Sequence, residues 1–176
     1  MTADDARTTD ARSDDEGPEE TTDGGGTYTL LLVREASGTV TVGALGAVHL
    51  PAGAYAYVGS ALGTGGFARV DRHERVAAGD HDTRHWHVDY LTGDEGTRLA
   101  DVVTSAGVDA ECRIADGIRC RLQGGDRPTD ASVGPDAVPV ADFGASDCDC
   151  RTHLFGHASL DELTSAVHDT HETVRA

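Results

Sequence analysis

The fold of this chain is indicated most clearly by residues 50–61, which read LPAGAYAYVGSA. A Pro–Ala–Gly turn signal comes first, and the residues at 54–60 then alternate in side-chain type. Because successive side chains of a strand point to opposite faces, Tyr55 and Tyr57 would share one face of a sheet and the small apolar residues between them the other. The segment therefore predicts a strand over 54–60 that carries two tyrosines on one side.

Working outward, residues 27–34 (TYTLLLVR) are apolar on both faces, which predicts a central strand of a sheet. Alternating side chains predict further strands over 39–42 and 85–91, and another strand is predicted over 99–104. In the segment 85–91, the alternation would set His85, His87 and Asp89 on one face. Residues 123–141 are rich in Gly and Pro and predict a loop.

Helices are predicted over 67–78, over 110–122 and from Ser159 to near the end of the chain. Asp109 is the expected cap of the second helix, and Ser159 with Glu162 forms a capping box for the third. His168 and His171 fall on the polar side of that last helix and are expected at the surface. Together these elements predict a single α+β domain, a small and mainly antiparallel sheet flanked by helices.

The charge balance is strongly acidic, with 31 acids against 14 bases and a net charge of −17. All of the bases are Arg, and such a Lys-free acidic surface is expected of a protein that works in molar salt, where the Debye length is about 3 Å. The acidity therefore does not exclude a nucleic-acid partner. No apolar run approaches the roughly 20 residues of a membrane span. A cytoplasmic protein with no membrane partner is expected.

The first 25 residues differ in composition from the rest of the chain. They hold nine acids, two Arg and almost no large apolar side chain. Such a segment cannot bury enough surface to order itself. Residues 1–25 are therefore predicted to be a disordered acidic tail.

Basic side chains gather in the first predicted helix and the segment after it. Arg69, Arg72 and His73 lie at spacings that put them on one helix face. Residues 66–87 hold four Arg, four acids and four His, so their formal charge is zero in a chain of −17. Glycines precede the helix, whose first amides could receive a phosphate. This stretch is the best candidate for contact with an anion.

Several short motifs follow one another along the chain in a specific order. They are Gly26-Thr27-Tyr28, the run 50–61 that contains Tyr57-Val58-Gly59, Arg69, Arg72-His73, the run 85–90 (HWHVDY), Glu111-Cys112 and Phe143-Gly144 followed by Ser146-Asp147-Cys148 and Cys150. In this order the chain resembles the GIY-YIG nuclease superfamily, and in particular its Uri-type branch. The resemblance implies a nuclease domain over 26–158, with residues 159–176 as a C-terminal helix packed on it.

The resemblance also implies roles for individual residues. Tyr28 and Tyr57 would stand next to the attacking water, Arg69 would hold the scissile phosphate, and Glu111 would ligate a divalent ion, Mg²⁺ or Mn²⁺. Phosphodiester cleavage needs this division of labour, because charge on the phosphate must be stabilised while a water is positioned. Arg supplies a planar fork of donors, and one carboxylate can hold Mg²⁺ without filling its shell.

Further residues around these positions are assigned less uniquely. Gly59, Ser60 and Arg72 are expected to contact the substrate. His73 could act in proton transfer or contact phosphate near Arg69, and it could equally pair with an acid on its own helix.

A second constellation is Cys148, Cys150 and His153, with His157 nearby. Soft ligands at short spacing are typical of zinc sites, although a fourth ligand is not evident from the spacing. The alternative is a tight turn with partly buried thiols, held by the side chain of Asp147.

The leading functional hypothesis is a metal-dependent endonuclease, a hydrolase whose partner is nucleic acid, with DNA favoured over RNA. One alternative is a nucleic-acid-binding module that keeps the fold without catalysis. The other is a structural protein built around the Cys/His metal site.

Overall fold

The structure is a computed structural model that describes residues 24–123, 137–145 and 148–176. Most of the predicted acidic tail, much of the predicted 123–141 loop and Asp147 lie outside these residues. Within the described part, the chain forms a mixed α+β domain in which a central sheet separates two layers.

The central sheet has five strands in the order β5-β1-β4-β7-β6, and every neighbouring pair is antiparallel. The strands are β1 (Gly26–Arg34), β4 (Gly53–Ser60), β5 (Thr97–Ala106), β6 (Ala137–Pro139) and β7 (Leu154–His157). The predicted strands over 27–34, 54–60 and 99–104 are confirmed, and β1 is central because β5 and β4 flank it. The short β6 lies within the stretch predicted as loop. This strand is too short, and too close to Pro and Gly, to show a strand pattern in the sequence.

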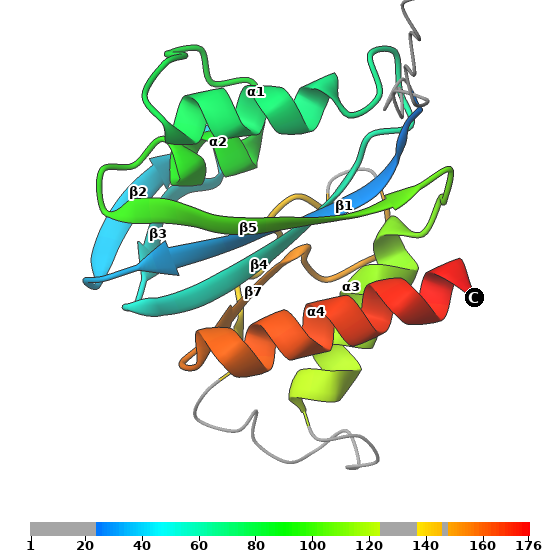
Figure 1. The fold of residues 1–176 in the computed structure, drawn as a ribbon. Coiled ribbons are helices and arrows are strands. Elements are labelled where there is room, and N and C mark those ends of the chain that lie inside the picture. Colours follow the sequence, from blue (N-terminus) through cyan, green and yellow to red (C-terminus); the bar gives the residue numbers. More distant parts are fainter. Residues whose placement is uncertain (1–23, 124–136, 146–147) are drawn as a thin grey trace, which may run out of the picture.

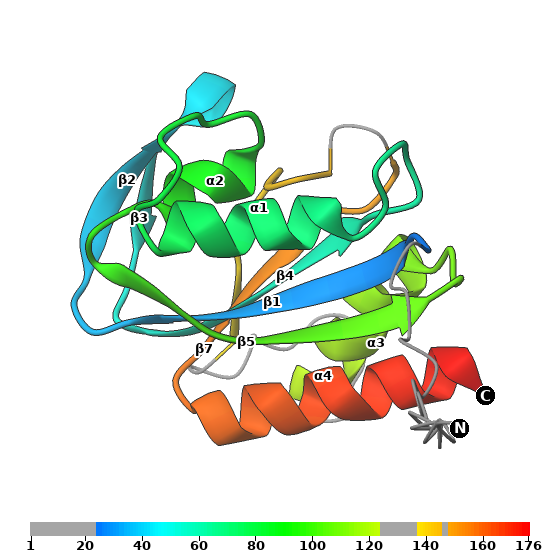
Figure 2. The same ribbon diagram turned by 45° about the horizontal axis from the view of Figure 1, so that its top comes forward.

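A second, two-stranded sheet is formed by β2 (Gly38–Val42) and β3 (Gly46–Leu50), joined by the single turn η1 (Gly43–Leu45). It confirms the predicted strand at 39–42 and fills the chain between β1 and β4. Helices α1 (Ala68–Ala77) and α2 (His87–Thr92) lie on the same side of the central sheet as this hairpin, whereas α3 (Glu111–Leu122) and α4 (Leu160–Arg175) cover the other side (Figures 1 and 2).

Strand alternation divides the core into two clusters, one on each face of the central sheet. Tyr28, Leu30 and Tyr57 pack with residues of α1, α2 and the β2–β3 hairpin. Leu31 and the small residues of β4 pack instead with buried side chains of α3 and α4. The predicted facing of the tyrosines in β4 is thereby confirmed. The same alternation gives one face a site with aromatic and polar side chains and the other the surface against which α3 and α4 pack.

The predicted strand over 85–91 is wrong, because residues 87–92 form the helix α2. The Asp89 carboxylate accepts hydrogen bonds from the backbone amides of His85 and Trp86 at 2.7 and 2.8 Å. These bonds satisfy amides at the start of the helix, which otherwise have no partner. A helix of six residues is too short to display a helical period, so the sequence pattern did not reveal it.

Two further predictions about helices need correction. Ala110, not Asp109, is the N-cap of α3, and its amide donates to the Thr27 side chain of β1. His171 is buried rather than at the surface, with Nε2 2.8 Å from Thr29 Oγ1 and Nδ1 2.8 Å from Ser105 Oγ. In both cases the partner is distant in sequence, so a local pattern could not show it. The Ser159 cap of α4 is confirmed, since its hydroxyl accepts from the Glu162 amide.

Helix α4 is the longest helix in the described part of the chain. No helix among these residues combines the length and the apolar character that crossing a membrane would require.

Candidate functional site

The antiparallel pairing of β1 with β4 brings two tyrosines together. Tyr28 lies opposite Gly59, and Leu30 lies opposite Tyr57, so the two rings are diagonal neighbours on one face. Their centroids are 6.5 Å apart with the planes tilted by 53°, and both rings are buried. The two tyrosines that the family resemblance singles out therefore lie side by side in the structure.

Gly59 makes room for the Tyr28 ring. A Cβ atom at position 59 would lie 2.5 Å from Cζ and from the hydroxyl oxygen of Tyr28. Contacts this short do not occur between real side chains, so any other residue would displace the tyrosine. Gly59 is therefore needed to make room for the Tyr28 ring, whether or not a substrate binds.

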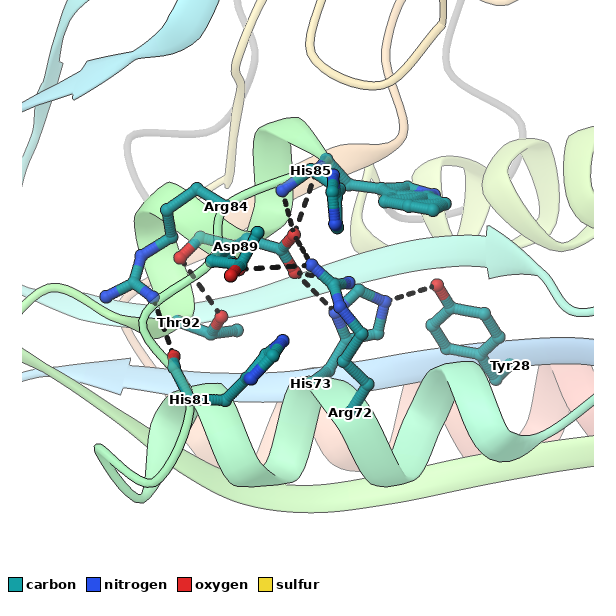
Figure 3. A network of polar contacts seen from close by, with 10 residues as sticks. Tyr28, Arg72, His73, His81, Arg84, His85, Asp89 and Thr92 are labelled. Atoms are coloured by element: carbon teal, nitrogen blue, oxygen red, sulfur yellow. Dashed lines mark hydrogen bonds and ion pairs between the residues drawn. The ribbon is translucent and has the colours of Figure 1, made fainter.

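The Tyr28 hydroxyl is one end of a buried polar chain that crosses three elements. It lies 3.0 Å from Nε2 of His73 on α1, and Nδ1 of His73 lies 2.8 Å from Oδ1 of Asp89 on α2. All three side chains are almost completely shielded from solvent. Figure 3 shows His73 standing between the phenol and the carboxylate. The carboxylate that pairs with His73 thus comes from α2 and not from its own helix.

Asp89 is held ionised by its surroundings. Burial acts to raise its pKa, but hydrogen bonds from His73, from Arg72 and from the amides of Trp86 and His85 hold the pKa well below its usual range. The strongest partner by distance is Arg72, whose Nη2 lies 2.5 Å from Oδ2. A carboxylate that accepts several such bonds is stable as the anion even without solvent.

The ionised Asp89 determines how the proton of Tyr28 is shared. A carboxylate without a proton can only accept, so Nδ1–H of His73 donates to Asp89, and the Nε2 of a neutral imidazole accepts from the Tyr28 hydroxyl. Burial and then the nearby Tyr57, Glu111 and Asp89 raise the pKa of Tyr28 well above its usual value, against the lowering effect of Arg69. At neutral pH Tyr28 is therefore a phenol whose proton points at the imidazole.

Arg69 lies at the start of α1, beside the end of β4. Its Nη1 donates to the Ser60 carbonyl at 2.7 Å, and its guanidinium carbon lies 4.7 Å from the centre of the Trp86 ring. The guanidinium of Arg72 lies 5.0 Å from the same ring. A guanidinium has five N–H donors, and within the described residues Arg69 commits one of them. Arg69 can therefore hold an anion, whereas Arg72 is committed to Asp89 and to the Thr83 carbonyl.

Glu111 is the first residue of α3, on the opposite face of the sheet from α1. Its position depends on Thr27, whose hydroxyl donates to the Val108 carbonyl at 2.7 Å and accepts from the Ala110 amide at 3.0 Å. The Glu111 carboxylate is partly exposed, and its Oε1 lies 3.1 Å from Nδ1 of His153. Its charge also helps to raise the pKa of Tyr28, after the larger effects of burial and Tyr57.

Beside Glu111 lies a cluster of four ligand side chains, Cys112, Cys148, Cys150 and His153. The three Sγ atoms and one nitrogen of His153 lie within 4.8 Å of one another, close enough to hold a metal ion. Cys112 supplies the fourth ligand that the sequence spacing did not reveal. Cys120, the remaining cysteine, is exposed and outside the cluster.

The thiols of this cluster differ in the direction in which their pKa values are shifted. Burial, followed by hydrogen bonds with Cys112 and Cys148, raises the pKa of Cys150 far above its usual value. Burial also acts to raise the pKa of Cys148, but hydrogen bonds from Cys150 and Cys112 and the nearby His153 lower it. Such mutual crowding of thiols is relieved when a cation binds, because the thiolate is the ligand and metal binding releases protons.

Three residues of this region had no assigned role in the sequence interpretation. They are Asp89, Trp86 and Cys112. The first two lie in the run HWHVDY, whose alternation is typical of a strand and conceals their contacts with α1. Cys112 directly follows Glu111, but 35 residues separate it from the next cluster ligand, and only the fold brings them together.

A family described as domain of unknown function DUF123 matches residues 27–176. No curated protein and no solved structure matches the chain.

Proposed function

We propose that this chain, which belongs to the family of the domain of unknown function DUF123, is a metal-dependent endonuclease of the GIY-YIG type that hydrolyses phosphodiester bonds of nucleic acid. The observation that carries the proposal is the buried chain from Asp89 through His73 to Tyr28, with Arg69 beside it. A carboxylate and an imidazole that are aligned on one hydroxyl are the parts needed to move a proton at that hydroxyl.

In this proposal Tyr28 takes a proton from the attacking water as it passes its own to His73. The pKa of Tyr28 in the folded chain is too high for the side chain to be a phenolate at neutral pH. His73 supplies the missing acceptor through Nε2, and Asp89 stabilises the imidazolium that results. Tyr57, whose ring lies next to that of Tyr28, would help to orient the water.

Arg69 would bind the phosphate that is cleaved. Its contacts with Ser60 and Trp86 fix the direction of the guanidinium, which lowers the entropic cost of holding an oxyanion. A guanidinium that is already oriented stabilises charge as it develops, and such preorganisation is a large part of enzymatic rate enhancement. Asp89 pairs with Arg72, the second arginine that stacks on the same indole ring.

In this proposal Glu111 is the residue that would hold a divalent ion. Mg²⁺ and Mn²⁺ sites in nucleases commonly use one or two carboxylates and leave the remaining positions to water and phosphate. Glu111 is partly exposed, and its Oε1 faces His153, which leaves Oε2 for an ion. When bound, the ion would neutralise charge on the phosphate oxygens. Glu111 would hold it on the side of the site that lies opposite α1.

The Cys/His cluster is a different site and would take a different ion. Three thiolates and one imidazole are soft and borderline donors, which favour zinc over Mg²⁺ or Mn²⁺. Four protein ligands would also close the coordination shell, as in structural zinc sites. We therefore assign zinc to the cluster and Mg²⁺ or Mn²⁺ to Glu111.

A second candidate function is binding of nucleic acid without cleavage. It is favoured by the burial of Tyr28 and His73, which in the present conformation have almost no surface open to a substrate. In that case Arg69 and Trp86 would still form a surface for phosphate and base. The two functions separate on turnover and not on affinity.

The test is cleavage by the purified chain in molar KCl. Supercoiled, branched and single-stranded DNA and structured RNA are each incubated with Mg²⁺, Mn²⁺ or EDTA. We expect cutting that needs a divalent ion and that is lost in Glu111→Gln but retained in Glu172→Gln, an exposed acid on α4. Binding of these substrates without cutting by the folded chain in any ion would replace the nuclease proposal with the binding module.

A further inference from the structure

We infer that a zinc ion bound by Cys112, Cys148, Cys150 and His153 aligns Glu111, through His153, for its role in the active site. The inference has two parts, a zinc centre and a link from that centre to Glu111. The second part rests on the proposed function, whereas the zinc centre does not.

The four ligand atoms already approach tetrahedral spacing. Zinc–sulfur bonds of about 2.3 Å and zinc–nitrogen bonds of about 2.0 Å place neighbouring ligands roughly 3.5 to 3.8 Å apart. Sγ of Cys148 and Nε2 of His153 lie 3.4 Å apart, and the whole set lies within 4.8 Å. A contraction of the widest pair by about 1 Å would complete the site, and the ligands from 148–150 lie in a loop that can supply it.

The cluster joins parts of the chain that are distant in sequence. Cys112 lies in the first turn of α3, whereas the other three ligands lie in the segment that leads into β7. His153 is firmly held there, because its amide donates to the Phe143 carbonyl at 2.8 Å and its carbonyl accepts from the Val58 amide at 2.9 Å. A bound ion would therefore tie the start of α3 to the central sheet.

The two ring nitrogens of His153 face different partners. Nε2 faces Cys148, and Nδ1 lies 3.1 Å from Oε1 of Glu111. Nδ1 is buried, and apart from this ion-pair contact with Glu111 it has no hydrogen-bond partner among the described residues. A buried imidazole that has a thiol cluster at Nε2 and a carboxylate at Nδ1 is the observation that points to a metal ligand at Nε2.

Ligation at Nε2 would resolve this arrangement. A histidine that binds a metal through one nitrogen carries its proton on the other and donates it, very often to a carboxylate. Here that carboxylate is Glu111, which would receive a fixed hydrogen bond at Oε1 and present Oε2 to the divalent ion. Zinc would hold the same turn of helix a second time through Cys112, the next residue in the chain. His153 is thus a positioning residue for Glu111.

The zinc centre is tested without any substrate. We expect one zinc per chain by elemental analysis, and X-ray absorption should show three sulfur ligands and one nitrogen. Cys148→Ser should weaken zinc binding by at least about 100-fold in competition with a chelator, whereas Cys120→Ser should leave it unchanged. If the unaltered, folded chain binds neither zinc nor Co²⁺ stoichiometrically, the inference is overturned, and this result needs no variant.

The link to Glu111 is tested by zinc affinity and by the visible spectrum of the Co²⁺-loaded chain. Loss of the carboxylate that receives a ligand's hydrogen bond typically weakens metal binding by about 10- to 100-fold. We expect that loss, with a shifted Co²⁺ band, in Glu111→Ala, and substantial rescue in Glu111→Gln, which keeps an oxygen acceptor. Glu172→Ala is the matched control. Zinc affinity and spectrum that are unchanged in Glu111→Ala would overturn the link.

These measurements also separate the two proposals. Zinc binding that responds to Glu111, in a chain that cuts no nucleic acid, would support the linked centre and count against the nuclease. Metal-dependent cutting by a chain without zinc would support the nuclease and count against the linked centre.

Discussion

Thr27 of β1 and Ala110, the N-cap of α3, are joined by a 3.0 Å hydrogen bond, in which the Ala110 amide donates to the Thr27 hydroxyl. The same hydroxyl donates to the Val108 carbonyl. The next residue of β1 is Tyr28, which faces the other side of the sheet and contacts His73. Two adjacent residues of one strand therefore position both halves of the site, the tyrosine on one face and the helix that starts at Glu111 on the other.

The first prediction concerns this anchor. Thr27→Val keeps the shape of the side chain but leaves the Ala110 amide without its acceptor. We expect the free energy of unfolding to fall by about 1 to 3 kcal/mol, the usual cost of an unsatisfied buried donor. Thermal or denaturant unfolding measures it, with Thr41→Val on the exposed side of β2 as the control. A loss no larger than that of the control would show that the α3 start is held by other contacts.

Nucleic-acid cleavage by Thr27→Val should also decline, because the start of α3 carries Glu111. This part of the effect should appear at temperatures where the variant is fully folded. An unchanged rate would separate the position of Glu111 from the Thr27 anchor.

The second prediction concerns Asp89, the carboxylate at the centre of the polar chain. Asp89→Asn keeps the size of the side chain but removes the negative charge that fixes the proton on Nδ1 of His73. We expect cleavage to fall by about 100- to 10,000-fold, the range that general acid–base groups contribute. The measurement is the single-turnover rate, taken where circular dichroism shows the variant to be folded.

Asp94→Asn is the matched control, since Asp94 also pairs with an arginine, Arg34, at 2.6 Å but away from Tyr28. It should lower stability and leave the single-turnover rate of the folded chain near that of the parent. Equal losses of rate in the two variants would contradict a functional chain from Asp89 to Tyr28.

The third prediction distinguishes catalysis by Arg69 from simple attraction of phosphate. Arg69→Lys keeps the positive charge but loses the planar fork that reaches both the Ser60 carbonyl and an oxyanion. We expect a fall of roughly 10- to 1,000-fold in the cleavage rate at saturating substrate, about the cost of one oriented oxyanion donor, and a much smaller change in binding. Arg75→Lys, at an exposed position of the same helix, should change neither. A change in binding alone would favour the non-catalytic module.

The sequence was informative wherever a residue's structure depends on its neighbours in the chain. The central strands follow from alternation and apolar runs, and the Ser159 cap lies within one turn of the helix that it begins. The tyrosine pair follows as well, because two predicted strands that lie antiparallel bring their side chains onto one face. Arg69 and Glu111 were correctly expected in helices by their spacing and context.

What the sequence did not reveal depends on contacts between distant segments. Helix α2 is begun by the Asp89 carboxylate, whose other partners come from α1. Cys112 joins the cluster only after α3 has packed beside the segment before β7. His171 has the polar neighbours of a surface residue in sequence, yet the fold turns it toward Thr29 and Ser105. None of these contacts leaves a periodic signal.

The last prediction follows from that buried histidine. Burial, and then the charges of Arg175 and His168, lower the pKa of His171 to about 4, against about 6.5 in an unfolded chain. Between these values the unfolded state binds a proton that the folded state excludes, so stability falls as the pH drops through this window and is unaffected by this group above about pH 7. The difference between the two pKa values corresponds to a loss of about 3 kcal/mol in the free energy of unfolding by pH 4.

Denaturant unfolding in molar KCl from pH 4 to pH 8 measures this loss, and His171→Gln isolates it from the titration of the many carboxylates. Gln keeps polar atoms for Thr29 and Ser105 but cannot take up the proton. We expect the variant to be less stable than the parent at pH 8 and to lose less stability on acidification. His168→Gln, which alters an exposed histidine of the same helix, should follow the parent curve closely. Parallel curves for the parent and His171→Gln would mean that His171 takes up its proton at an ordinary pH in the folded chain.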